Sequence, residues 1–335
     1  MRRSRAAGRA RARQSTLRPP ATGLPPTASV PSARTVFADR VRPSANTPDA
    51  SGGLGGEDGG VEEPRPIDPV EHAHLRDATG FSPPVHRYAP GPGLADLVRR
   101  YWVPVWSLPP GTVSSQRVLQ YPVCLVVVAD SYARLYGVRT GLSVVELSGT
   151  GWAVGAMLQP AGGSLVWGGA VTELTDRHVD LSEVPGVDGS GLTGRVRAAM
   201  GPAPDAAGRL AAVAHLEREL ERLAPVDDEG RLVNAIVEYV EGDPEVRRVG
   251  QVCAKFDIGD RTLQRLLARR LGLNPKWLIQ RRRLQEAAAR LRTGPGTLAR
   301  VSADLGYADQ AHFTRDFRTV TGVTPGDYAA EPRTP

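Results

Sequence analysis

The chain reads Val252-Cys253-Ala254-Lys255-Phe256-Asp257-Ile258 and, about 50 residues later, Val301-Ser302-Ala303-Asp304-Leu305-Gly306-Tyr307. The first stretch is followed by Arg261-Thr262-Leu263-Gln264-Arg265-Leu266-Leu267 and Gly272-Leu273-Asn274-Pro275, the second by Ala311-His312-Phe313-Thr314-Arg315-Asp316-Phe317 and Gly322-Val323-Thr324-Pro325. This self-similarity predicts one supersecondary unit that is used twice. Each copy has the order helix, tight turn, helix that places one helix in a groove of DNA, so the repeat predicts contact with two turns of the duplex.

Each copy carries a residue suited to the bend between its two helices. The first helix of copy one is expected over residues 245–256, and Asp257 follows it where copy two has Gly306. A tight bend often needs a left-handed backbone, which Gly adopts freely and Asp tolerates better than most residues. The second helix is expected to start near Asp260 in copy one and near Asp309 in copy two, because Asp is a good helix cap. The turn of copy two is one residue longer than that of copy one.

The second helix of each copy has an apolar side and a polar side. The core-facing positions are Leu263, Leu266 and Leu267 in copy one, with Phe313 and Phe317 in copy two. The outward positions are Arg261, Gln264 and Arg265 in copy one, and Gln310, His312, Thr314 and Arg315 in copy two. Arg can bind guanine and Gln adenine through paired hydrogen bonds, while Thr and further Arg side chains bind phosphate. The alternative is a solvated polar face, which gives no reason for the repeat; His312 can either touch DNA or lie at the rim.

Residues 275–293 between the copies predict one long helix. Pro275 suits a first helical position, and Gly294 with Pro295 ends the pattern. A helix of about 18 residues is roughly 27 Å long, so it can hold two reading helices about one DNA turn, ~34 Å, apart. Three consecutive arginines, Arg281, Arg282 and Arg283, are expected either to contact phosphate or to face solvent.

Charge is distributed unevenly along the chain. Residues 245–335 hold 17 Lys/Arg against 9 Asp/Glu, a net charge of +8, whereas residues 57–244 have a net charge of −10. This contrast favours nucleic-acid binding by the C-terminal part alone. The longest apolar run, residues 123–129, is too short to cross a bilayer. Cys124 and Cys253 show no metal-ligand spacing and suggest no disulfide framework, which is typical of the reducing cytoplasm.

The remaining chain is divided into three parts. Residues 1–80 are rich in Arg, Pro, Ala, Gly and Ser and predict a disordered tail. Residues 81–200 predict a β-rich domain, from short β-prone runs separated by Gly/Pro turns; residues 164–171 are one of those runs. Residues 205–242 predict two amphipathic helices separated at Pro225. These helices either form a linker or dimerisation pair, or pack on the β-rich domain.

Residues 245–330 resemble the DNA-binding domain of the AraC/XylS family of bacterial transcription regulators. The motifs that carry the resemblance are Arg261-Thr262-Leu263-Gln264-Arg265, Ala303-x-Leu305-Gly306-Tyr307, Phe313-x-Arg315-x-Phe317 and Gly322-x-Thr324-Pro325-x-x-Tyr328. The resemblance implies a seven-helix, double helix-turn-helix fold on a DNA site of roughly 20 base pairs. It also implies base contacts from the positions of Arg261, Gln264 and Arg265 and of Ala311, His312 and Arg315. This chain departs from the family pattern at two positions. Asp257 stands where the first turn often has Gly, and Ala311 stands where the family often has a longer polar residue, so copy two is expected to contact fewer bases.

The β-rich region is similar, more weakly, to the N-terminal sensor domains of such regulators, which are often cupin-like. The expected architecture is therefore a mainly-β sensor domain followed by an all-α double helix-turn-helix domain. We expect a cytoplasmic, sequence-specific regulator, most simply an effector-responsive activator. Its expected partners are double-stranded DNA, RNA polymerase, a small-molecule effector and a second copy of the chain; no membrane, metal or cofactor is expected.

Two alternatives remain open at this point. One is a constitutive or architectural DNA-binding protein whose β domain only dimerises. The other is a cupin-type enzyme fused to a DNA-binding module. The sequence shows no His/Glu metal set and no Ser/His/Asp or Cys/His arrangement, so we expect no enzymatic activity.

Overall fold

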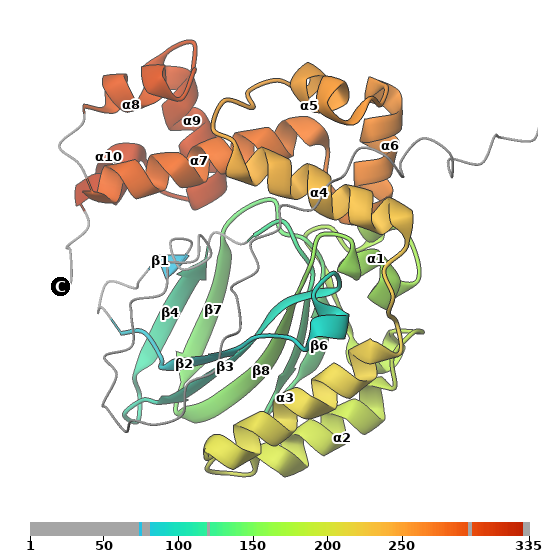
Figure 1. Ribbon diagram of the computed structural model, residues 1–335. Helices are drawn as coiled ribbons and strands as arrows, with labels where there is room; N and C mark the ends of the chain where they lie inside the picture. Colours follow the sequence, from blue (N-terminus) through green and yellow to red (C-terminus); the bar gives the residue numbers. More distant parts are fainter. Residues whose placement is uncertain (1–73, 76–80, 119–120, 294–296, 331–335) are drawn as a thin grey trace, which may run out of the picture. The chain divides into compact units, whose positions relative to one another are not determined.

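The computed structural model describes residues 74–75, 81–118, 121–293 and 297–330 (Figure 1). Nearly all of the predicted N-terminal tail, residues 1–80, lies outside the described residues. The described chain begins with a β-rich part, continues through three longer helices, and ends in six helices that include both copies of the repeat. This order confirms the expected fold class of a mainly-β domain followed by an all-α domain.

Two antiparallel sheets form the β-rich part (Figure 1). The larger has the strand order β2-β3-β8-β5-β6-β9, and the smaller has the order β1-β4-β7. The strands are β1 (His74–Leu75), β2 (Val85–Tyr88), β3 (Val98–Ser107), β4 (Val113–Val118), β5 (Leu125–Ala129), β6 (Ala133–Tyr136), β7 (Ser143–Ser148), β8 (Thr150–Leu158) and β9 (His178–Asp180). Every residue of β5 is buried, which explains its unbroken run of apolar side chains.

Two tryptophans of β3 lie across glycines of β8. In the register of these strands Trp102 pairs with Gly155, and Trp106 pairs with Gly151. A Cβ on Gly155 would lie 2.4 Å from the Trp102 ring, and one on Gly151 would lie 2.5 Å from Trp106. The glycines therefore make room for the two indoles against the middle of the larger sheet.

The expectation of a strand over residues 164–171 is wrong. This run forms α1 (Gly162–Trp167) and a short 3-10 turn at Val171–Glu173. A short apolar run is consistent with either a buried strand or a buried helix, so its periodicity could not separate them. The glycines decide the outcome, because a Cβ on Gly163 would lie 2.4 Å from the sulfur of Cys124.

Three helices follow the strands: α2 (Gly189–Met200), α3 (Ala206–Glu221) and α4 (Asp228–Gly242). Each begins at an Asp cap whose carboxylate accepts a hydrogen bond from a glycine N–H three residues later; the caps are Asp188, Asp205 and Asp227. The predicted break at Pro225 separates α3 from α4. The predicted apolar stripes are largely buried within the chain, at Leu216, Leu220, Ile236 and Val240 for example, although Leu210 is exposed. α2, which lies inside the predicted β-rich range, was not expected.

The C-terminal helices are α5 (Val249–Phe256), α6 (Asp260–Leu271), α7 (Pro275–Thr293), α8 (Leu298–Asp304), α9 (Gln310–Thr321) and α10 (Pro325–Ala330). The predicted extent of the long helix between the copies is confirmed. The first helix of copy one begins later than residue 245, because Gln251 caps the chain by accepting hydrogen bonds from the N–H groups of Arg247 and Arg248. α4 contacts α5, α6 and α7 and so completes a group of seven helices.

The two copies of the repeat belong to different hydrophobic cores. Leu263, Leu267 and Leu271 of α6 share one core with the larger β sheet and with α3 and α4. Phe313 and Phe317 of α9 lie in a second core, together with the later half of α7. The division falls within α7, between Ile279 and Leu284. Copy one is therefore continuous with the larger sheet through its core, whereas copy two packs on α7 and is contacted from the β-rich part by Val118 and Leu142.

Candidate nucleic-acid interface

The two bends of the repeat have the left-handed backbone that the sequence predicts. Asp257 ends α5 at φ 52° and ψ 46°, and Gly306 follows α8 at φ 71°. Asp257 is one of two non-glycine residues with positive φ in the part of the chain that the structure describes. A residue with left-handed φ thus precedes the second helix in both copies.

In copy one, α6 presents the predicted polar side chains to solvent. Leu263, Leu266 and Leu267 are buried, as expected. Arg261, Gln264 and Arg265 are exposed on the remaining surface of the helix. Their grouping follows from the 3.6-residue period, because residues three and four apart share a face.

The predicted cap of α6 needs a correction. Gly259 occupies the cap position, and Asp260 is the first helical residue. The Asp260 carboxylate accepts a hydrogen bond of 3.0 Å from the side-chain amide of Gln264. This contact uses one of the two N–H groups of the Gln264 amide, so its second N–H and its oxygen remain available to an adenine.

In copy two, Asp309 caps α9 as predicted, and its carboxylate accepts a 2.6 Å hydrogen bond from the His312 N–H. Phe313 and Phe317 are fully buried, which turns the opposite side of the helix outward. That side borders a surface hollow of about 620 Å³. The hollow is lined by four predicted residues and two others: Gln310, Ala311, Thr314, Arg315, Arg318 and Thr324.

Arg318 and Thr324 were not among the predicted site residues. Arg318 is exposed and lies three residues after Arg315, so the helical period alone could have found it. Thr324 precedes α10, and its hydroxyl contacts Asp327 at 2.6 Å. No pattern within α9 points to Thr324, because Thr324 lies outside that helix, just before α10.

His312 is held by contacts within copy two. Its Nε2 lies 3.4 Å from the Asp316 carboxylate, and its ring meets the Tyr307 ring edge-on with centroids 5.2 Å apart. The side chain is about half exposed. It therefore lies beside the hollow without lining it, which fits the rim position weighed above.

The arginines of α7 do not behave as expected, since two of the three are buried. Arg281 is 1% exposed and pairs with Glu241 at 3.5 Å; Arg282 is 6% exposed and pairs with Glu286 at 3.1 Å. Burial lowers the pKa of both guanidinium groups and raises the pKa of the Glu241 carboxyl. Both phosphate contact and solvent exposure are thus wrong for these two residues.

Arg283 has a different environment. Its guanidinium lies 4.0 Å from the centroid of the Tyr307 ring, so it stacks on copy two. The side chain is partly exposed. Of the three arginines, Arg283 alone is partly exposed, although its Nε and Nη2 atoms are buried.

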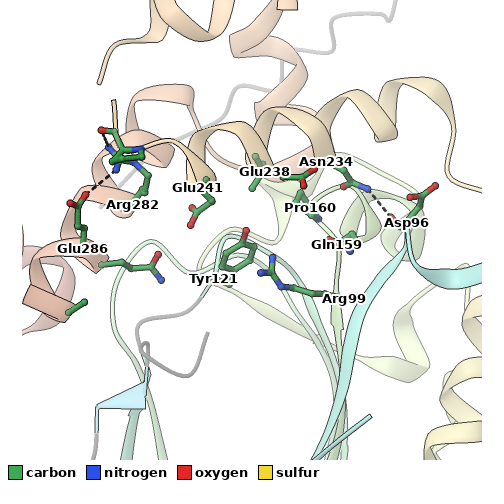
Figure 2. Close-up of a pocket in the computed structure, with 15 residues that line it drawn as sticks. Asp96, Arg99, Tyr121, Gln159, Pro160, Asn234, Glu238, Glu241, Arg282 and Glu286 are labelled. Carbon is green, nitrogen blue, oxygen red and sulfur yellow. Dashed lines mark hydrogen bonds and ion pairs between the residues drawn. The ribbon is translucent and has the colours of Figure 1, made fainter. Parts of the chain in front are cut away.

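A larger cavity, of about 780 Å³, lies where the β-rich part, α4 and α7 meet (Figure 2). Its wall includes Asp96, Arg99 and Tyr121 from the β-rich part, Glu238 and Glu241 from α4, and Arg282, Gln285 and Glu286 from α7. Its volume is in the range of small-molecule sites.

Among the described residues, no group of three or more His, Cys, Asp and Glu side chains could hold a metal ion. No helix of the described chain is long and apolar enough to span a membrane.

Two family models match the chain. Residues 252–331 match a helix-turn-helix domain family, and residues 86–180 match a family described as a domain of unknown function. The first match covers both copies of the repeat, from α5 to α10. The second covers the larger sheet and most of the smaller one.

Several known regulators are similar to part of the chain. The chain is 34% identical over 102 residues to the F1 operon positive regulatory protein of Yersinia pestis, covering 30% of this chain and 34% of that protein. It is 30% identical over 76 residues to the transcriptional activator RhaS of Pectobacterium carotovorum, covering 23% of this chain and 27% of that protein. The chain therefore spans about a third of the length of the curated relatives it matches.

Two solved structures are also similar. An AraC family transcriptional regulator from Rhodopseudomonas palustris is 25% identical, with 31% of this chain and 99% of that chain covered and a TM-score of 0.29. ToxT from Vibrio cholerae is 13% identical, with 77% of this chain and 97% of that chain covered and a TM-score of 0.33.

Proposed function

The chain belongs to the AraC/XylS family of transcription regulators, and on that premise we propose that it binds a specific DNA sequence through α6 and α9. The observation that carries the proposal is the paired arrangement of these helices. Each follows a left-handed turn, buries one apolar side and exposes a polar side containing arginine. An exposed polar helix in this setting is suited to the major groove.

The proposed DNA-binding residues are Arg261, Gln264 and Arg265 in copy one, and Gln310, Ala311, His312, Thr314 and Arg315 in copy two. Their exposure supports this assignment, as does the hollow beside α9. Arg318 is added as a phosphate or base contact because it borders the same hollow. The 19 residues of α7 give a spacer of roughly 28 Å between the two copies.

The proposal extends to regulation. A small-molecule effector would bind the β-rich part or its junction with α4 and α7, and activation would proceed through RNA polymerase in the cytoplasm. The continuous core between the β-rich part and copy one supports such coupling, since a change in one part is transmitted through shared packing. A homodimer remains part of the proposal, formed outside the buried stripes of α3 and α4.

Selection of bound sequences from random duplex DNA by the full chain tests the proposal. The full chain is needed because α6 shares its core with the β-rich part. We expect the selected sequence to be bound about 10³-fold or more tightly than random DNA at physiological salt. Equal binding of selected and random duplexes, with a steep salt dependence, would instead support the architectural alternative.

A further inference from the structure

The wall of the 780 Å³ cavity comes from three parts of the fold: the β-rich part, α4 with the residues that follow it, and α7 (Figure 2). Asn234 of α4 joins two of them, because its side-chain amide donates 2.8 Å to the Asp96 carbonyl and its oxygen accepts 2.9 Å from the Ala161 N–H. The third part is α7, the helix that connects the two copies of the repeat. A molecule in this cavity would touch the β-rich part, α4 and α7 together.

The positive groups in the wall already have partners. Arg282 pairs with Glu286 and donates to the carbonyls of Pro244 and Val246. Arg99 lies 4.1 Å from the centroid of the Tyr121 ring. An anionic ligand would have to compete with these contacts to reach either guanidinium.

Two negative groups in the wall lack such partners. Asp96 and Glu238 are exposed, and within the described chain neither carboxylate has a hydrogen-bond or ion-pair partner. They lie on either side of Asn234 in Figure 2, and Glu238 is one helical turn from Asn234 on α4. Even with the Arg99 guanidinium in the same wall, the two carboxylates leave this end of the cavity with a net negative charge. An apolar ligand placed against these carboxylates would strip them of water without replacing it.

An unpaired donor in the wall is independent of these charges. The side-chain nitrogen of Gln285, on α7, is buried and has no hydrogen-bond partner among the described residues. Buried amide groups are nearly always paired with protein, water or ligand. This nitrogen therefore calls for an acceptor atom inside the cavity.

From these three observations we propose that the cavity binds a small organic amine. Its ammonium group is held by Asp96 and Glu238, and a polar acceptor on the same molecule meets the Gln285 amide. The inference deepens the proposed function, because it names the chemical class of the effector. Binding across the β-rich part, α4 and α7 stabilises the arrangement in which these parts meet, and so shifts the population in which the two reading helices hold one relative position.

Titration calorimetry on the full chain tests this inference directly, without DNA. The probes are ethanolamine, choline and 5-aminopentanol, each of which has a hydroxyl oxygen as acceptor, with pentanediol and glutarate as the neutral and anionic analogues of 5-aminopentanol. We expect at least one amine to give a saturable one-site isotherm, and neither analogue to bind as tightly. Glu238→Gln and Asp96→Asn should each weaken that binding about tenfold or more, as expected for loss of a charged hydrogen bond.

Glu183→Gln is the matched control, since Glu183 is an exposed carboxylate away from the cavity; it should bind the amine like the unaltered chain. Absence of binding by every amine, tighter binding of glutarate, or an affinity unchanged in both cavity variants would overturn the inference. DNA binding by the same preparations separates the two proposals. Specific DNA binding without amine binding refutes the cavity assignment alone, whereas amine binding without specific DNA binding refutes the proposed function.

Discussion

Arg265 and Arg315 occupy matching exposed positions in the two copies, since each is the sixth residue of its helix. If each reads a base, Arg265→Ala should relax sequence preference in one half of the DNA site and Arg315→Ala in the other. The expected loss is about 1–3 kcal/mol for each on the selected sequence. Binding titrations against site variants altered in one half at a time measure this directly.

The control for both variants is Arg218→Ala, which removes an exposed arginine from α3. It should leave DNA affinity nearly unchanged. A loss of equal size on selected and random DNA would show that Arg265 and Arg315 bind phosphate, not bases.

The turn residue of copy two gives a second prediction at this scale. A Cβ at Gly306 would meet no atom closer than 3.6 Å, so Gly306→Ala costs stability only through its left-handed backbone. We expect a loss of about 1–2 kcal/mol in the free energy of unfolding, and a smaller loss for Gly306→Asn, because Asn tolerates this conformation better. Gly250→Ala, inside α5 with open space around it, should raise stability by up to about 1 kcal/mol. Equal losses for Ala and Asn in denaturant titrations would contradict the turn assignment.

At the scale of elements, a charge cluster connects α6 to the start of α4. The Arg270 guanidinium donates to the Glu229 carboxylate at 2.6 Å and to the Ser164 hydroxyl at 3.3 Å, and it also pairs with Asp227. Burial tends to raise the pKa values of Asp227 and Glu229. The Gly230 N–H at Asp227, together with Arg270 at both carboxyls, nevertheless holds those values below their usual range.

Folding lowers the pKa values of these two carboxyl groups. Their ionised forms therefore stabilise the folded chain above the pKa values of the unfolded chain, near pH 4, and this contribution is lost as pH falls through the pKa values of the folded chain. Arg270→Gln should therefore lower the free energy of unfolding by about 1–2 kcal/mol at neutral pH, after allowing for solvent screening of the partly exposed carboxylates. The difference from the unaltered chain should narrow below about pH 4.

Arg247→Gln, which removes an exposed pair with Glu245, is the control and should change stability by less than about 1 kcal/mol. Thermal melts of the three proteins across the acid range provide the comparison. A difference for Arg270→Gln that persists unchanged at pH 3 would contradict the ionic account.

The helices of the repeat could be predicted because their signals are local. Pro275 starts α7, Asp309 caps α9, and the leucines and phenylalanines recur at helical spacing. The helix at α1 could not be predicted, since its position depends on the close approach of Gly163 to Cys124, which is far away in sequence. Likewise, α2 has a weak apolar pattern rich in glycine, so its packing on α3 and the sheet decides its conformation.

At the scale of the whole described chain, burial of Arg281 depends on Glu241, which lies 40 residues earlier in sequence. A run of three arginines gives no sign of such a partner, so the sequence favoured a solvent or phosphate role. The same limit applies to the cavity, whose wall joins Asp96, Glu238 and Gln285 from three separate stretches. The exposed reading faces, in contrast, follow from the repeat itself.

These features support an account in which α7 holds two DNA-reading helices while its first half joins copy one to the β-rich part. Footprinting of the full chain on its selected duplex tests that account most directly. We predict protection of two adjacent major grooves on one face of the DNA, about 10 base pairs apart, with Arg265→Ala and Arg315→Ala each weakening protection of a different groove. Protection of a single groove, or uniform weak protection along the duplex, would contradict the double-reader account.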